Sequence, residues 1–297
     1  MAKSGIKIHG TFGDLGVAIR VRRFKRRAEA PALEKVYDGT EHGHDFTEII
    51  IGLSGHGVHR VDGRDYPVAA GDVFVVQGEQ THALLRRDNL EWLEVHYNPQ
   101  RFAMPTDLLL RLPGYHALFV LEPKRRGRGK FEGRLRLRST RLAEVNQIAA
   151  TMEDELHRKS DGYEAVLVGR LILLLTLLSR EYSKAPTGEA HALLRVGEVV
   201  SLLEREYERN WRLSELCRLA HMSRSNLLVV FREATGQTPI EYLIHVRLRE
   251  AMLQLRTTDR PVTEIAFAVG FGDSNYFTRQ FRRAVGMSPR EYRRSVV

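Results

Sequence analysis

The stretch FGDSNYFTRQFRRAVGMSP, residues 271–289, carries the pattern that decides the fold of the C-terminal part of the chain. Phe277 and Phe281 stand four residues apart, so they share one face of a helix. Asp273 or Ser274 is a suitable cap at the start of this helix, and a Gly-x-x-Pro sequence ends it. The segment therefore predicts a short helix that buries its aromatic face and exposes hydroxyl, amide and guanidinium groups.

This stretch has an earlier copy in the same chain. SELCRLAHMSRSNLLVVFREATGQTPIEYL (214–243) aligns with TEIAFAVGFGDSNYFTRQFRRAVGMSPREYR (263–293). The offset is 49 up to Asn226 and Asn275, and it is 50 from Phe231 and Phe281 onward. A repeat of this kind indicates two copies of one structural unit.

Each copy is expected to form a helix, a short turn and a second helix, which is the helix-turn-helix pattern. In the second copy Gly270 supplies the turn, where a left-handed backbone is easy for glycine. His221 stands at that place in the first copy, which costs about 1 kcal/mol if the turn is left-handed there. Ser223 is the expected cap of the second helix in the first copy.

The exposed face of these helices fits DNA. Arg binds guanine and Asn binds adenine through paired hydrogen bonds in the major groove, and other arginines fix the register on phosphates. The formal net charge of +9 also favours a polyanionic partner. The alternative interpretation, a solvated arginine-rich surface on an ordinary helical bundle, does not account for the repeat.

Residues 193–294 resemble the double helix-turn-helix DNA-binding domain of the AraC/XylS family, and the motif that carries the resemblance is AVGFGDSNYFTRQFRRAVGMSPREYR. The resemblance implies a rigid connector helix over 240–255, which places both reading helices in successive major grooves about 34 Å apart. It also implies promoter DNA and RNA polymerase as partners. The base-reading candidates carried over by position are Ser225, Leu228, Val229, Ser274, Asn275, Thr278 and Arg279. The phosphate-binding candidates are Arg224, Arg282, Arg283, Arg290 and Arg293.

Leu228 and Val229 are apolar where the family often has polar side chains. The first copy is therefore expected to read thymine methyl groups or mainly to hold the DNA backbone.

The first half of the chain has the spacing of β-strands. The short β-branched runs are TEIIIGL (47–53), GVHRV (57–61), RDYPV (64–68), DVFVV (72–76) and LEWLEVHY (90–97). Asp62-Gly63 is a type I′ hairpin signal between two of them. AIRVRRFKRR (18–27) is expected to be a further strand with a charged outer face. Many short strands at close spacing predict a small antiparallel barrel or sandwich.

EHGHDFTEIIIGLSG (41–55) and the later Gly71-Asp72 with His82 resemble the two cupin motifs. In AraC-type regulators this surface generally serves ligand sensing, so the favoured interpretation is a small-molecule site. The candidate ligand-binding residues are His42, His44, Glu48, His82, Trp92 and His96. Two alternatives stay open, a divalent metal held by imidazoles and a carboxylate, and histidines that only stabilise the fold. No metal or other cofactor is assigned.

The domain organisation follows from the change in period. We expect a cupin-like sensing and dimerisation domain at 1–182, with a barrel at about 17–100 and helices at about 140–182. A linker at 183–192 and the DNA-binding domain at 193–294 complete an α+β chain whose C-terminal part is all α. The apolar stripe from Leu142 to Leu156 and the family likeness predict a homodimer.

These patterns predict a cytoplasmic transcription regulator, an activator that responds to a small molecule such as a sugar. The segment LPGYHALFVLEP (112–123) is most similar to rhamnose-type activators. A metal-dependent cupin oxygenase or isomerase fused to a DNA reader is the alternative; no catalytic residue is assigned, because the glycines of GLSGHG (52–57) fit hairpins. The longest apolar run, at 166–178, contains Arg170 and is too short for a membrane span, and the one cysteine fits a reducing compartment.

Overall fold

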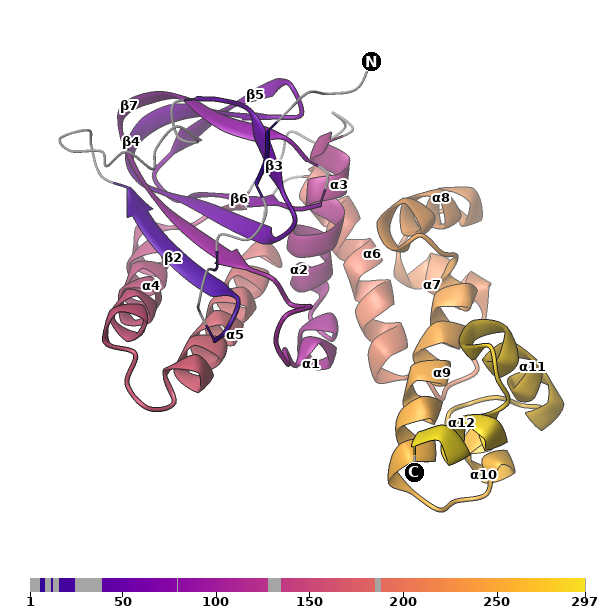
Figure 1. Ribbon diagram of the computed structural model, residues 1–297. Coiled ribbons are helices and arrows are strands. Elements are labelled where there is room, and N and C mark those ends of the chain that lie inside the picture. The colour runs from indigo at the N-terminus through magenta and orange to yellow at the C-terminus, as the bar shows by residue number, and fades with distance from the viewer. Residues whose placement is uncertain are drawn as a thin grey trace. The chain divides into compact units, whose positions relative to one another are not determined.

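The computed structural model describes residues 6–8, 12, 16–24, 39–78, 80–127, 135–184 and 188–296 (Figure 1). Residues 185–187 of the predicted linker and 25–27 of the predicted first strand lie outside them. The chain divides into two compact units. The first comprises residues 1–109 and 117–193, and the second comprises residues 110–116 and 194–297.

The first unit is built on one curved, mostly antiparallel sheet (Figure 1). Its strands are β1 (Ile6–Ile8), β2 (Ile19–Phe24), β3 (His42–His44), β4 (Thr47–Val61), β5 (Arg64–Ala69), β6 (Asp72–Val76), β7 (His82–Tyr97) and β8 (Leu135–Arg136). The order is β1-β3-β7-β4-β6-β8, with β2 paired to β7 and β5 to β4. The expected cupin-like fold is confirmed, although the ladder of the described strands does not close on itself.

The strands are longer than the sequence predicts. The runs at 47–53 and 57–61 are one strand, β4, whose pairing with β7 shifts register several times between Gly52 and His59. Such irregularities bend a strand and change which face its side chains point to. The hairpin prediction at Asp62-Gly63 is confirmed by positive φ angles of 49° and 78°.

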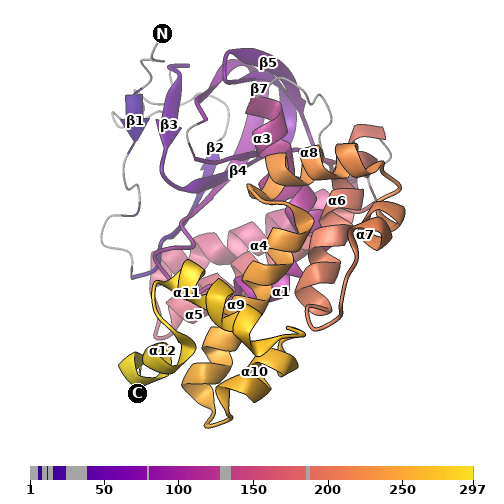
Figure 2. The ribbon, with the colours of Figure 1, turned by 90° about the vertical axis from the view of Figure 1, so that its right-hand side faces the viewer.

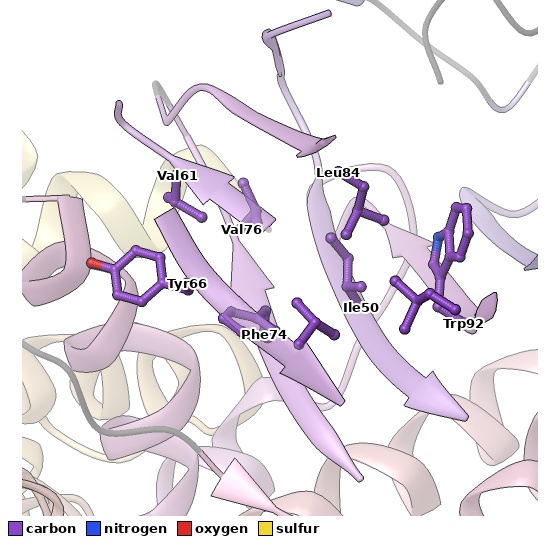
Figure 3. Close-up of a cluster of buried hydrophobic side chains, with 9 residues drawn as sticks. Ile50, Val61, Tyr66, Phe74, Val76, Leu84 and Trp92 are labelled. Carbon is purple, nitrogen blue, oxygen red and sulfur yellow. The ribbon is translucent and has the colours of Figure 1, made fainter. Parts of the chain in front are cut away.

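A cluster of buried apolar side chains fixes the middle of the sheet (Figure 3). Its members are Ile50, Val61, Tyr66, Val68, Phe74, Val76, Leu84, Leu90 and Trp92. The ring of Phe24 on β2 stacks on Trp92, with centroids 4.7 Å apart and planes 9° apart. Strand β2 is therefore anchored to the core of the sheet by an aromatic pair.

The helices of the first unit follow the sheet. They are α1 (Thr106–Leu110), the π-helix η2 (His116–Leu121), α3 (Glu122–Gly127), α4 (Ser139–Arg158) and α5 (Tyr163–Tyr182). The short helix α2 (Pro113–Tyr115) lies within residues 110–116, which belong to the second unit. Val145, Ile148 and Met152 of α4 are at most 4 % exposed. This apolar stripe, from which the sequence predicts a dimer, therefore packs inside the first unit and is not free to contact a second chain.

The second unit is all α, as predicted. It consists of α6 (Gly188–Arg205), α7 (Leu213–Leu219), α8 (Arg224–Thr235), α9 (Pro239–Thr257), α10 (Val262–Ala268), α11 (Ser274–Val285) and α12 (Pro289–Val296). Helix α6 begins inside the predicted linker, so the described linker residues from 188 onward are helical. Helix α9 runs between the two helix-turn-helix copies as the expected connector (Figure 1, Figure 2). In the described part of the chain, no helix combines the length and apolarity needed to cross a membrane.

Candidate DNA interface and ligand-binding cluster

The turn of the second copy needs glycine for two reasons. Gly270 has a φ of 96°, and a Cβ there would lie 2.5 Å from the carbonyl oxygen of Glu208. Asp273 then caps α11 by accepting a hydrogen bond from the backbone N–H of Tyr276 at 2.5 Å. In the first copy His221 has a φ of 50°, so the expected left-handed residue is present without glycine.

The structure corrects one part of the repeat alignment. The caps Ser223 and Asp273, each of which accepts from the N–H three residues later, are 50 residues apart. The inserted residue therefore lies in the turn, before the second helix begins. Asn226 does not match Asn275 as the sequence alignment predicts; Ser225 does.

The second helices bury one face and expose the other. Phe277 and Phe281 are fully buried, as predicted, and their counterparts Leu227 and Phe231 are buried in α8. Asn275 and Arg279 are exposed, whereas Ser274 and Thr278 are half-buried. The Thr278 hydroxyl donates to the backbone carbonyl of Ser274 at 2.9 Å. In α8, Ser225 is exposed, Leu228 is half-buried and Val229 is 57 % exposed.

The phosphate candidates differ in their surroundings. Arg224, Arg282, Arg283 and Arg290 are exposed. Arg293 is half-buried, and its guanidinium donates to the carbonyl oxygen of Arg260 at 2.6 Å. Arg293 therefore holds α12 to the loop before α10, a structural role that differs from the predicted phosphate contact.

Two buried charged residues that hold the connector, Arg247 on α9 and Glu204 on α6, could not be identified from the sequence. Arg247 donates to the carbonyl oxygens of Tyr207 and Arg209 at 2.7 and 2.8 Å. Glu204 on α6 accepts from the Tyr242 hydroxyl and from Arg249, both at 2.5 Å. These contacts attach α9 to α6 and to the following loop, which makes α9 a rigid base for both copies. An arginine on a helix face gives no sequence signal that separates this role from a solvated one.

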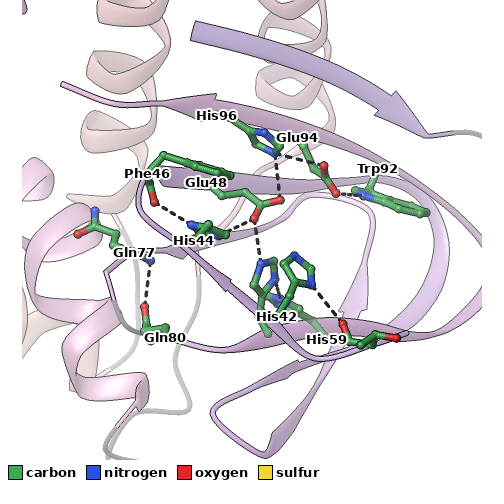
Figure 4. Close-up of polar contacts among 12 residues, drawn as sticks. His42, His44, Phe46, Glu48, His59, Gln77, Gln80, Trp92, Glu94 and His96 are labelled. Carbon is green, nitrogen blue, oxygen red and sulfur yellow. Dashed lines mark hydrogen bonds and ion pairs between the residues drawn. The ribbon is translucent and has the colours of Figure 1, made fainter. Parts of the chain in front are cut away.

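In the first unit, the predicted ligand-binding residues lie together around one carboxylate (Figure 4). Glu48 Oε2 lies 2.9 Å from His44 Nε2 and 3.0 Å from His82 Nε2, and Glu48 Oε1 lies 3.2 Å from His96 Nε2. Cross-strand pairing explains the gathering, since His42 pairs with His82 and Glu48 with His96. His42, His44, Glu48, His82, Trp92 and His96 are all at most 8 % exposed.

Two further residues belong to this cluster. Glu94 Oε2 lies 3.3 Å from His96 Nε2, and Glu94 Oε1 accepts from the Trp92 indole at 2.8 Å. His59 Nε2 lies 3.1 Å from His82 Nδ1. Strand alternation from Trp92 through His96 already indicates Glu94. His59 is an odd number of residues from Glu48, so only the irregular pairing of β4 brings both inward.

The imidazoles and carboxylates of the cluster shift one another's pKa values. Burial alone would raise the pKa of Glu48, but His82, His96 and His44 outweigh it and hold that pKa well below its usual range. Burial alone would lower the pKa of His96, but Glu48 and Glu94 raise it to about 9. For His42, burial and the nearby His82 lower the pKa to about 4, so this ring is neutral at pH 7.

Known proteins show the same two parts in the same order. A family model described as a helix-turn-helix domain matches residues 216–295, and one described as an AraC-like ligand binding domain matches residues 30–175. The HTH-type transcriptional activator RhaS of Klebsiella pneumoniae (strain 342) is 32 % identical over 254 residues, which cover 85 % of this chain and 87 % of the relative. The chain belongs to the AraC family.

Two further proteins are similar, one over most of this chain and one over about a third of it. The HTH-type transcriptional activator RhaR of Enterobacter sp. (strain 638) is 27 % identical over 288 residues, 94 % of this chain and 98 % of the relative. The crystal structure of the DNA-binding domain of AdpA with a target DNA is 35 % identical, covers 34 % of this chain and 91 % of that one, and has a TM-score of 0.32. As a member of the AraC family, this protein is a transcriptional activator with a helix-turn-helix DNA-binding domain and a ligand-binding domain.

Proposed function

We propose that this regulator reads an asymmetric promoter site with two helices, α8 and α11, and that a small molecule bound in the first unit controls it. The observation that carries the proposal is the pair of second helices, each capped and each with a buried apolar face, on either side of α9 in the chain. A rigid connector sets their separation, so one chain reads two successive major grooves.

The base-reading roles in the second copy belong to Asn275 and Arg279, with Ser274 and Thr278 beside them. Asn275 and Arg279 are exposed in the first half of α11, the part of a recognition helix that reaches base edges. In the first copy Ser225, Leu228 and Val229 stand at the positions of Asn275, Thr278 and Arg279. The exposed Val229 favours contact with thymine methyl groups. Arg224, Arg282, Arg283 and Arg290 contact phosphates.

The effector is a sugar, and it binds at the cluster around Glu48. Carboxylates and imidazoles are donors and acceptors for hydroxyl groups, and Trp92 supplies an apolar ring face beside them. Binding there acts on β2 through the Phe24–Trp92 stack and on α4 through Arg23, whose guanidinium lies 3.1 Å from Glu153. The protein is located in the cytoplasm, recruits RNA polymerase and is not an enzyme.

The sensing role is tested by thermal unfolding and promoter-DNA binding with a panel of monosaccharides that includes rhamnose. A binding sugar is expected to raise the unfolding temperature and to change DNA affinity, and Glu94→Gln is expected to weaken both effects because it removes a charge beside Trp92 and His96. Gln100→Ala, at an exposed position just after β7, is the matched control and keeps both. A sugar that stabilises both variants equally would contradict the assignment of the site.

The protein forms a homodimer through α5. The predicted stripe on α4 is buried, but α5 exposes apolar side chains seven residues apart, with Val166 39 % and Leu173 44 % exposed. Residues at this spacing lie on one face of a helix, so the two side chains form a seam suited to a second copy of the same helix.

A further inference from the structure

Three buried side chains of the cluster present ligand atoms to a common point. His42, Glu48 and His82 each offer one nitrogen or oxygen, and these atoms lie within 4.8 Å of one another. We infer that this triad binds one divalent transition-metal ion of the zinc or iron class. Two imidazoles and a carboxylate are the ligand set that such ions prefer over calcium or magnesium.

The hydrogen bonds of His42 and His44 set which of their nitrogens can face a cation. His42 Nδ1 lies 3.1 Å from the carbonyl oxygen of Thr40, so it must carry the proton, and Nε2 keeps a lone pair. His44 Nδ1 lies 2.9 Å from the carbonyl oxygen of Phe46, while its Nε2 lies 2.9 Å from Glu48. A neutral imidazole has only one N–H for these two acceptors. A cation beside Nε2 and the carboxylate satisfies both atoms.

His82 points to the same place. Its Nε2 lies 3.0 Å from Glu48 Oε2, yet this buried nitrogen makes no hydrogen bond to any of the described residues. A nitrogen and a carboxylate oxygen about 3 Å apart, without the alignment of a hydrogen bond, fit two ligands of one ion at about 2.0–2.2 Å. His59 holds the other nitrogen of His82, in the way that outer partners orient metal-ligating histidines.

The backbone carbonyls of Thr40 and Phe46 are outer partners of the same kind for His42 and His44. Three ligands leave a fourth coordination position, which either His44 or a hydroxyl group can take. This last step rests on the proposed sugar effector, but the ion is held whether or not a sugar binds. The competing state is the same network of imidazoles and carboxylate without an ion.

The test uses tag-free full-length protein that has been dialysed against a chelator. Addition of Co²⁺ is followed by its visible absorption, and Zn²⁺ binding by calorimetry. We expect one ion per chain, and we expect His82→Ala and His42→Ala to weaken binding about 100-fold or more, since removing an outer partner alone costs 10–100-fold. His56→Ala removes an exposed histidine of the same strand system and should bind like the unchanged protein.

Each outcome of this test either supports or overturns the metal site. Less than a tenth of an ion per chain in the unchanged protein, or equal binding by His56→Ala and His82→Ala, overturns the metal site. If His82→Ala does not fold, the result for His42→Ala stands, because this ring is the most exposed of the triad at 8 %. Failure of the sugar proposal looks different: the ion binds with the expected stoichiometry, but no monosaccharide shifts the unfolding temperature of the metal-loaded protein.

Discussion

Arg279 and Arg283 lie one turn apart on α11 and are both exposed, but their distances from the start of the helix differ. The N-terminal residues of a recognition helix reach base edges, whereas later ones reach the sugar-phosphate backbone. Arg279 also lies against an aromatic ring, with its guanidinium carbon 5.8 Å from the centre of Tyr276, which restricts the side chain. The two arginines therefore form a matched pair for separating sequence readout from charge.

We expect Arg279→Ala to relax sequence preference at one or two base pairs, with a loss of roughly 1–3 kcal/mol of discrimination. Arg283→Ala should weaken binding to all sequences alike and reduce the slope of log affinity against log salt by about one. Both are measured with a selected site and a scrambled duplex over a salt series. An equal loss on both duplexes for both variants contradicts these roles.

Residue identity alone predicts the reading face and the Glu48 cluster but not every role within them. Phe277 and Phe281 indicate the buried face of α11 because helical spacing is a local property. The structural role of Arg293 depends on the carbonyl of Arg260, which is distant in sequence. In the same way His59 reaches the cluster only through the irregular pairing of β4, which has no local signature.

At the scale of elements, the two turns offer a comparison within one chain. Gly270 and His221 both have a positive φ, but a Cβ at Gly270 would meet the backbone of Glu208, whereas His221 is exposed. In the second copy, close packing requires glycine in the turn. In the first copy, the turn keeps a non-glycine residue in a strained left-handed conformation.

We expect Gly270→Ala to destabilise the protein by about 1–3 kcal/mol, because the new Cβ meets the Glu208 carbonyl and the backbone is strained. His221→Gly should be close to neutral or stabilising by up to about 1 kcal/mol, because it relieves the left-handed strain at some cost in chain entropy. Denaturant unfolding measures both. Equal destabilisation by the two substitutions contradicts this account of the turns.

Helix α5 is the second element with a testable surface. Leu173→Glu is expected to convert the dimer to a monomer, because the substitution places a charge on the apolar seam that includes Val166. Leu108→Glu, at a side chain 60 % exposed on α1, is the control and should leave the dimer intact. Light scattering after size-exclusion chromatography gives the mass. A dimeric Leu173→Glu protein would place the interface elsewhere.

At the scale of the whole molecule, the chain joins an AraC-like ligand-binding domain to a helix-turn-helix domain, which we propose reads DNA with two heads. The sequence repeat predicts two helix-turn-helix units because each copy has its own cap, turn and pair of buried apolar residues. The division of the chain is less visible in sequence: α6 begins inside the predicted linker, and residues 110–116 belong with the second unit. Ser201 on α6 donates to the carbonyl oxygen of Arg111, a contact that no local sequence pattern predicts.

The most direct test of the two-headed reader is selection of binding sites from random duplex DNA with the full-length protein. The affinity of the selected site and of a scrambled control is then measured against salt concentration. We predict two different conserved blocks with centres about 10 base pairs apart, because we propose that α9 (Pro239–Thr257) sets α8 and α11 in successive major grooves. Recovery of no motif, with an affinity that falls equally for both duplexes as salt rises, would contradict the account.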